Sequence, residues 1–375
     1  MQCSMQGVSE QKVSKRLSNF ELLRIISMII IIAHHFSIHG GFEFLADRMT
    51  IPRLWIRFLQ MGGKIGANVF VLISGYFLIN TSKVKISKVI KLWLQLLTYS
   101  VAIYIVFVIM GLTDFSIRVL IKSCFPVTFG GWWFASCYFV LYLISPFINK
   151  FLVTLDKKTY QRLLVLVFVM WCLIPTATCQ LFESNNLLWF IYLYAIAGYI
   201  RLWHDTSKVP AFTYHVLTIG MVILTFLLIA VLDWLSLKSS FFVMYVTNLY
   251  EMQQFFILFI SVCMFLGFKG LNIKYSKAIN VVSTATFGIF LIHDNEYVRP
   301  FFWGELFNNA TYSDTTFLIP YSIGVICLVF AVCACIELLR IHILEKYYMR
   351  LITKIEPAID NSIDKFFSLK FFDRL

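Results

Sequence analysis

The chain has 375 residues, of which 59% are hydrophobic and only 14% are charged, and its formal net charge is +12. A soluble protein carries about 25% charged residues, because much of its surface stays in water. This composition excludes a cytosolic enzyme, a nucleic-acid-binding protein and a disordered scaffold, and it predicts an integral membrane protein.

A helix that crosses a membrane needs about 20 predominantly apolar residues. The chain contains ten such stretches, so we expect an all-α, polytopic membrane bundle of about ten transmembrane helices. The first stretch differs from a signal peptide because it carries Glu21 and Arg24 and lacks a small-residue cleavage site. The predicted spans cover residues 21–41, 65–80, 92–111, 131–149, 162–179, 187–203, 212–232, 246–267, 279–297 and 316–338.

These spans divide the chain into three parts. Residues 1–18 form a polar N-terminal tail, and residues 19–340 form the transmembrane domain. Residues 341–375 mix basic and apolar positions, which is typical of an amphipathic segment on a membrane surface.

The distribution of basic residues predicts the orientation of the chain in the membrane. If the N-terminus is inside, 24 of the 32 Lys and Arg residues fall on the inner side of the ten spans and 8 fall on the outer side. Cytoplasmic loops are enriched in Lys and Arg, so we expect both termini to be cytoplasmic.

The nine cysteines form no C-x-x-C pair, and no His/Cys spacing resembles a zinc site. Most of them lie in apolar stretches, where cysteine packs as a small hydrophobic residue. We therefore expect no metal site and no bound cofactor.

The first predicted span contains ionisable residues, which are costly inside a bilayer and indicate function. Arg24 and His35 are eleven residues apart, so in a helix they share one face and lie about 16 Å apart along the axis. Glu21 precedes Arg24 by three residues and can pair with it and orient it. The simpler alternative is that Arg24 extends to the inner interface and that the histidines mark the outer one.

The spacing of Arg24 and His35 resembles the R-x10-H motif of the acyltransferase 3 family, integral membrane O-acyltransferases that modify surface polysaccharides. The segment from Phe70 to Tyr76 is similar to the family's F-F-x-x-S-G-F segment. Residues 131–146 and 286–293 resemble later segments of the family in the expected order. The resemblance covers residues 19–340.

This resemblance implies roles for the two residues of the motif and for the residues that follow the second segment. His35 would be the base that activates an acceptor hydroxyl, and Arg24 would act on the acyl-donor side. Where the family often has R-x-x-R, this chain has Lys88 and Lys91, which can bind phosphate as point charges but can equally be an ordinary inner-side anchor. The remaining donor-binding candidates are Ser74 and Gly75.

Acyl transfer also needs a group that stabilises the tetrahedral oxyanion, and a dry cavity for both substrates. Oxyanion candidates are Asn68, Ser74, Trp132 and Trp133, although the two tryptophans also suit an aromatic belt at the interface. His293 and Asp294 lie near the outer end of a predicted span, with Arg299 close by in the sequence, and are candidates for acceptor binding. The simpler alternative is a polar helix end that is capped by water.

The expected protein is therefore a bacterial inner-membrane O-acetyltransferase with acetyl-CoA as donor substrate. Its expected acceptor is a hydroxyl of a cell-envelope, capsular or exopolysaccharide sugar, or of a lipid-linked glycan, and its surroundings are membrane lipid. A tunnel along the face of Arg24 and His35 would connect the two substrates. The alternative is an ion-coupled transporter or a polysaccharide flippase, because intramembrane Arg and His also occur in transporters.

Overall fold

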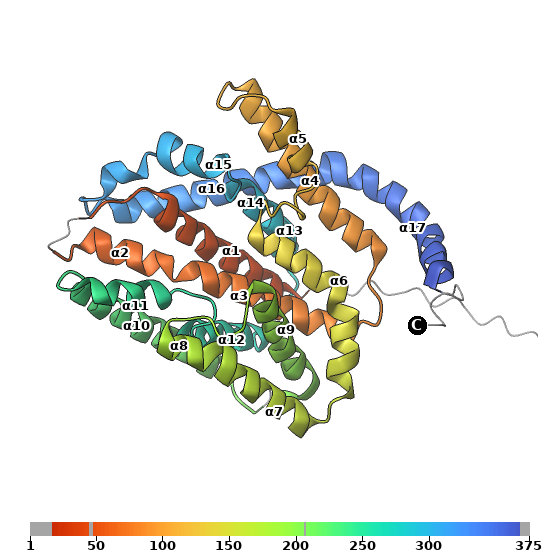
Figure 1. Ribbon diagram of the computed structural model, residues 1–375, viewed down its shortest axis with the longest axis horizontal. Helices are drawn as coiled ribbons and strands as arrows, with labels where there is room; N and C mark the ends of the chain where they lie inside the picture. The colour runs from red at the N-terminus through yellow and green to blue at the C-terminus, as the bar shows by residue number, and fades with distance from the viewer. Residues whose placement is uncertain (1–16, 45–47, 206–207, 368–375) are drawn as a thin grey trace, which may run out of the picture.

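The computed structural model describes residues 17–44, 48–205 and 208–367. These residues form helices joined by loops and turns and contain no β-strand, so the all-α prediction is confirmed (Figure 1). The predicted N-terminal tail, residues 1–18, lies outside the described residues except for its last two.

Seven helical segments among the described residues are long and apolar enough to cross a membrane, which confirms a polytopic membrane protein. Three of these segments join two or three elements. The seven are α1 (Ser18–His39), α2 (Ile51–Gln60) with α3 (Gly62–Leu78), α4 (Ile86–Ile109), α6 (Trp133–Thr154), α7 (Lys157–Phe168) with η1 (Val169–Leu173) and α8 (Ile174–Thr178), α10 (Ala211–Ser236), and α16 (Leu318–Arg340) with η5 (Ile341–Glu345) and α17 (Lys346–Phe367) as far as Ser362.

The other three predicted spans coincide with helices that are shorter or less apolar. α9 (Asn186–Trp203) is rich in Tyr and Trp, α12 (Phe255–Lys269) has 15 residues, and α13 (Lys277–Thr284) is separated from α14 (Thr286–His293) at Ala285. A helix of 15 residues reaches about 22 Å, less than the ~30 Å thickness of the hydrocarbon core. By length and apolarity the described residues thus support seven candidate spans, whereas ten were predicted.

Short helices in the connections were not predicted, because a few residues carry too little periodicity to identify them. α5 projects from the bundle in Figure 1. These short elements are α5 (Ile117–Ser123), η2 (Ser240–Phe242), α11 (Val243–Asn248), α15 (Val298–Pro300), η3 (Phe301–Leu306) and η4 (Asn309–Tyr312).

The C-terminal region continues the last long helix, so the amphipathic tail expected from residue 341 begins within this helix. Residues 318–367 are helical throughout, and α17 extends past the rest of the bundle in Figure 1. The Glu356 carboxylate accepts a hydrogen bond from the Ser87 backbone N–H at the start of α4 (3.0 Å). α17 is therefore attached to the bundle, and its location on a membrane surface stays a prediction.

α1 lies inside the bundle and contacts α2, α3, α12, α13, α14 and α16. Its closest approach is to α3, where a Cβ atom built on Gly66 would lie 2.7 Å from both the Ser27 carbonyl oxygen and Ile31 Cγ1. Small residues allow helix backbones to approach closely in membrane bundles. Gly62 and Gly63 of α3 meet α1 as closely, so Gly66 is one of three glycines that let α1, which carries His35, sit close against α3.

Candidate active site

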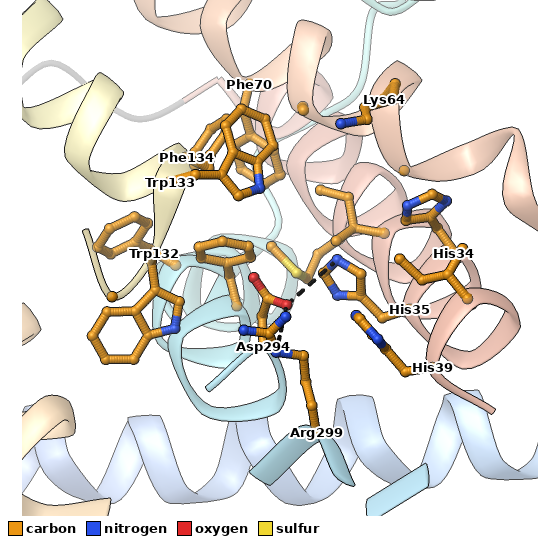
Figure 2. A pocket seen from close by; sticks show the side chains of 18 of the residues that line it. His34, His35, His39, Lys64, Phe70, Trp132, Trp133, Phe134, Asp294 and Arg299 are labelled. Atoms are coloured by element: carbon orange, nitrogen blue, oxygen red, sulfur yellow. Dashed lines mark ion pairs between the residues drawn. The ribbon is translucent and has the colours of Figure 1, made fainter. Parts of the chain in front are cut away.

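A cavity of about 280 Å³ lies near the C-terminal end of α1. Its walls are formed by α1, α3, the beginning of α6 with the loop before it, and α14 with the turn that follows (Figure 2). From α1 it is lined by Met28, Ile31, His35 and His39, whose spacing of three or four residues places them on one helix face. One face of α1 thus brings His35 and His39 to the same cavity, and His34 of the same helix lies at its edge.

His35 occupies the centre of this arrangement and is 8% exposed. Its Nδ1 atom lies 2.9 Å from Nε2 of His293, which is fully buried on α14. Its Nε2 atom lies 3.7 Å from Oδ1 of Asp294, on the side of the cavity (Figure 2). The structure therefore brings His35 of the first predicted span against His293 and Asp294 at the end of a much later one.

Two basic side chains complete the polar part of the lining. Arg299 Nε lies 3.5 Å from the same Asp294 oxygen, and Lys64 lies 4.8 Å from the centre of the Trp133 ring. Lys64 also lies 3.9 Å from Glu251. The carboxylate of Asp294 is thus placed between the His35 imidazole and the Arg299 guanidinium.

Aromatic rings form the wall opposite α1. Trp132, Trp133 and Phe134 lie across the cavity from His35 in Figure 2. Trp132 is 3% exposed, and its indole Nε1 is buried with no hydrogen-bond partner among the described atoms. A buried donor without a partner costs about 1–3 kcal/mol, so this N–H is available to a substrate oxygen.

Asn68, Ser74 and Gly75 lie outside the cavity lining. The Asn68 amide donates to the Met252 carbonyl (3.0 Å) and accepts from the Trp189 indole (3.0 Å), so both ends of the amide are occupied. The Ser74 hydroxyl bonds to Phe70 of its own helix. Gly75 packs against the Tyr194 backbone of α9. In this structure all three make contacts between or within helices.

Arg24 and Glu21 form the ion pair that their spacing predicted, with Nη1 of Arg24 3.0 Å from Oε1 of Glu21. Glu21 also accepts a hydrogen bond from Ser283 of α13 (2.5 Å). Glu21 contacts α13 and His35 contacts α14, so the two ends of α1 contact two consecutive helices, which together span residues 277–293. The cavity, however, reaches Met28 and does not include Arg24, one helical turn further on. The predicted tunnel is not open here.

Lys88 and Lys91 lie in the first turns of α4, away from the cavity. α4 follows the short loop after α3, and the ring of Phe77 near the end of α3 packs edge-to-face against that of Phe20 at the start of α1, with ring centres 5.0 Å apart. These lysines are therefore at the Arg24 end of the bundle. Lys91 forms an ion pair with Glu345.

Lys64 and His34 also line the cavity, although neither was predicted from the sequence. Lys64 directly precedes a predicted span, and a lone Lys beside glycines in an apolar region was the available signal. The Nδ1 atom of His34 lies 2.7 Å from the Gln60 carbonyl oxygen at the end of α2, which holds its ring at the cavity edge.

His35, His39 and Asp294 each offer one potential metal ligand, and these ligand atoms lie within 4.8 Å of one another. The Arg299 guanidinium beside Asp294 places a positive charge next to this group, which disfavours a metal cation. The donor set therefore fits acid–base chemistry better than metal binding.

The comparison with known families agrees with this geometry. A family model described as an acyltransferase domain matches residues 17–338, which is most of the chain. No curated protein and no solved structure shows significant similarity to the chain. The matched range contains α1 with both residues of the motif, every helix that lines the cavity, and the turn that carries Asp294. The chain belongs to the acyltransferase 3 family and is a membrane acyltransferase.

Proposed function

We propose that the protein transfers an acetyl group from acetyl-CoA to a hydroxyl of a cell-surface saccharide or lipid-linked glycan, with His35 as the general base. One observation carries this proposal: the His35 imidazole lies in a water-sheltered cavity, between a histidine on one ring nitrogen and a carboxylate near the other. A neutral imidazole has one ring nitrogen with a free lone pair, which suits a group that takes and returns a proton.

The reaction is a direct transfer in two steps. The acceptor hydroxyl gives its proton to Nε2 of His35 while its oxygen bonds to the thioester carbonyl carbon. The tetrahedral oxyanion then collapses, the C–S bond breaks, and the departing CoA thiolate takes the proton from His35. Asp294, with its Oδ1 3.7 Å from Nε2, stabilises the imidazolium that exists between the two steps.

The indole N–H of Trp132 is the best-placed candidate to stabilise the oxyanion. It is buried, it lines the cavity, and it has no partner among the described atoms, so it can donate without breaking a bond. The neighbouring aromatic rings offer flat apolar faces for the carbon-bound hydrogens of a sugar ring. Asn68 and Ser74 fit this role less well because their polar groups are engaged elsewhere.

The two substrates reach His35 from opposite ends of the bundle. The Arg24 end carries the basic residues of the early inner loops, which suit the phosphates of CoA, and the positive-inside rule places it in the cytoplasm. The cavity then opens toward the outside of a bacterial inner membrane, where the glycan is. Met28 separates the cavity from Arg24, and its flexible side chain can move aside for the acetyl group.

The test is surface-glycan O-acetylation, measured by NMR in cells that contain the wild-type protein, His35→Ala or His342→Ala at matched membrane levels. His342 is an exposed histidine in η5, outside the cavity, and serves as the control. We expect acetyl signals with the wild type and the control and a loss of at least 100-fold with His35→Ala, because general-base catalysis contributes 10²–10⁴-fold.

Full acetylation with His35→Ala would remove this residue from catalysis. An absence of acetylation in every strain would reject the acetyl group or the glycan acceptor, and measurement of solute flux would then test the transporter and flippase alternatives.

A further inference from the structure

We infer that His293 is a positioning residue that holds His35 in the tautomer with its basic lone pair on Nε2, facing the cavity. The inference rests on the proposed role of His35 as the base. It assigns to His293 a function other than acceptor binding, and it follows from a chain of hydrogen bonds that runs from α14 to α1.

The chain begins at a backbone carbonyl. Nδ1 of His293 lies 2.6 Å from the carbonyl oxygen of Ile289, one turn earlier in the same helix. A carbonyl oxygen only accepts hydrogen bonds, so Nδ1 of His293 carries a hydrogen. The short, local bond also fixes the orientation of the ring, because both partners belong to α14.

The charge of His293 determines whether its other nitrogen, Nε2, carries a hydrogen. The residue is fully buried, and a second proton would place an unpaired positive charge inside the bundle. His293 is therefore neutral, and Nε2 has a lone pair. His35 Nδ1, 2.9 Å away, must donate its hydrogen to that lone pair.

The remaining nitrogen of His35 is then determined as well. A neutral imidazole has a single N–H, so with Nδ1 protonated His35 presents an unprotonated Nε2. The 3.7 Å distance from Nε2 to Asp294 Oδ1 is too long for a hydrogen bond, which agrees with a lone pair rather than an N–H at that position. The Nε2 atom of His35 is thus ready to accept a proton before the acceptor substrate binds.

The same bond assists the reaction itself. When His35 takes the acceptor's proton on Nε2, its Nδ1–H still donates to His293, and the bond becomes charge-assisted and stronger. Without the lone pair of His293 Nε2 as a hydrogen-bond acceptor, the His35 ring is free to adopt the Nε2–H tautomer. That tautomer cannot accept a proton from the substrate on Nε2. Loss of the correct tautomer is costly in enzymes that use a positioned histidine.

The experiment compares His293→Leu, which has no acceptor atom, with His293→Gln, whose amide oxygen can accept from His35. The exposed control is His342→Leu. Purified proteins are assayed for thiol release from acetyl-CoA, with envelope glycan extracted from the producing cells as acceptor. Side-chain ¹⁵N NMR of histidine-labelled protein in detergent, assigned with His35→Gln, reports the tautomer of His35.

We expect His293→Leu to lower kcat about 100-fold with less than threefold change in the KM for acetyl-CoA and for the glycan. We expect His293→Gln to retain at least a tenth of the wild-type kcat. In the wild type, the NMR spectrum should show His35 protonated on Nδ1, and in His293→Leu that signal should be lost or shared between both nitrogens.

An Nε2–H tautomer of His35 in the wild type would overturn the inference, and so would wild-type kcat in His293→Leu. An increase in the KM for the glycan alone would assign His293 to acceptor binding instead. The NMR result does not depend on activity, so it decides the tautomer even if His35→Ala proves fully active and the proposed base is wrong. If His293→Leu fails to fold, the wild-type spectrum and the Gln variant still decide.

Discussion

Gly66→Ala should displace the helix that carries His35. A Cβ atom at this position would lie 2.7 Å from the Ser27 carbonyl oxygen and from Ile31 Cγ1. Ordinary contacts of a Cβ begin at 3.4 Å, so α1 and α3 must separate by about 0.7 Å. The Ser27 oxygen belongs to the α1 backbone, so rotation of a side chain cannot relieve this contact.

The expected loss follows from the geometry around His35. A shift of about 0.7 Å in α1 would lengthen the 2.9 Å bond to His293 and change the position of Nε2 in the cavity. A displacement of about 1 Å can lower the rate of an enzyme 10²-fold, so we expect a 10- to 100-fold decrease in kcat. Overpacking of this kind also destabilises a protein by about 1–3 kcal/mol.

The matched control is Gly324→Ala in α16, where nothing lies within 4 Å of the added atom. Because Ala is the better helix former, this control should be as stable as the wild type or slightly more stable. Acetyl-CoA turnover and thermal unfolding in detergent measure both effects. Equal activity and equal stability of Gly66→Ala and the wild type would refute the argument that this glycine seats α1.

Two further predictions concern a buried ion pair and the inner end of the cavity. Asp233→Leu should destabilise the protein by about 3–5 kcal/mol, because the fully buried carboxylate accepts hydrogen bonds from Arg53 (2.7 Å) and Arg57 (2.9 Å). The double variant Asp233→Leu/Arg53→Met should recover part of this stability in thermal unfolding. No recovery would show that the ion pair is not the cause. Met28→Trp should lower thiol release from acetyl-CoA at least tenfold, because the larger and stiffer indole blocks the end of the cavity nearest Arg24, whereas Met28→Leu should stay within about threefold. Equal rates in the two variants would place the donor's path elsewhere.

Much of the helical framework follows from local features of the sequence. A helix in a bilayer satisfies its backbone hydrogen bonds internally, so an apolar stretch predicts a helix without knowledge of its neighbours. A helix therefore lies at each of the ten predicted positions. The ion pair of Arg24 with Glu21 could be predicted for the same reason, because both residues belong to one helix.

The number of spans could not be predicted in this way. α12 and α14 are strongly apolar, yet they are short and are largely buried against other helices. Apolar composition has the same appearance whether a residue faces lipid or a neighbouring helix. Only the packing of the bundle distinguishes the two.

The sequence by itself determined the fold class, the family resemblance and the presence of His35 on the first helix, because these depend on composition and on spacing within one segment. Only the tertiary structure decided which groups surround that histidine. His35 and His293 are 258 positions apart, and the order of protons between them depends on a 2.9 Å contact between α1 and α14. A hydrogen bond acts over a few ångströms in space, so helix packing rather than spacing along the chain determines which partners it joins.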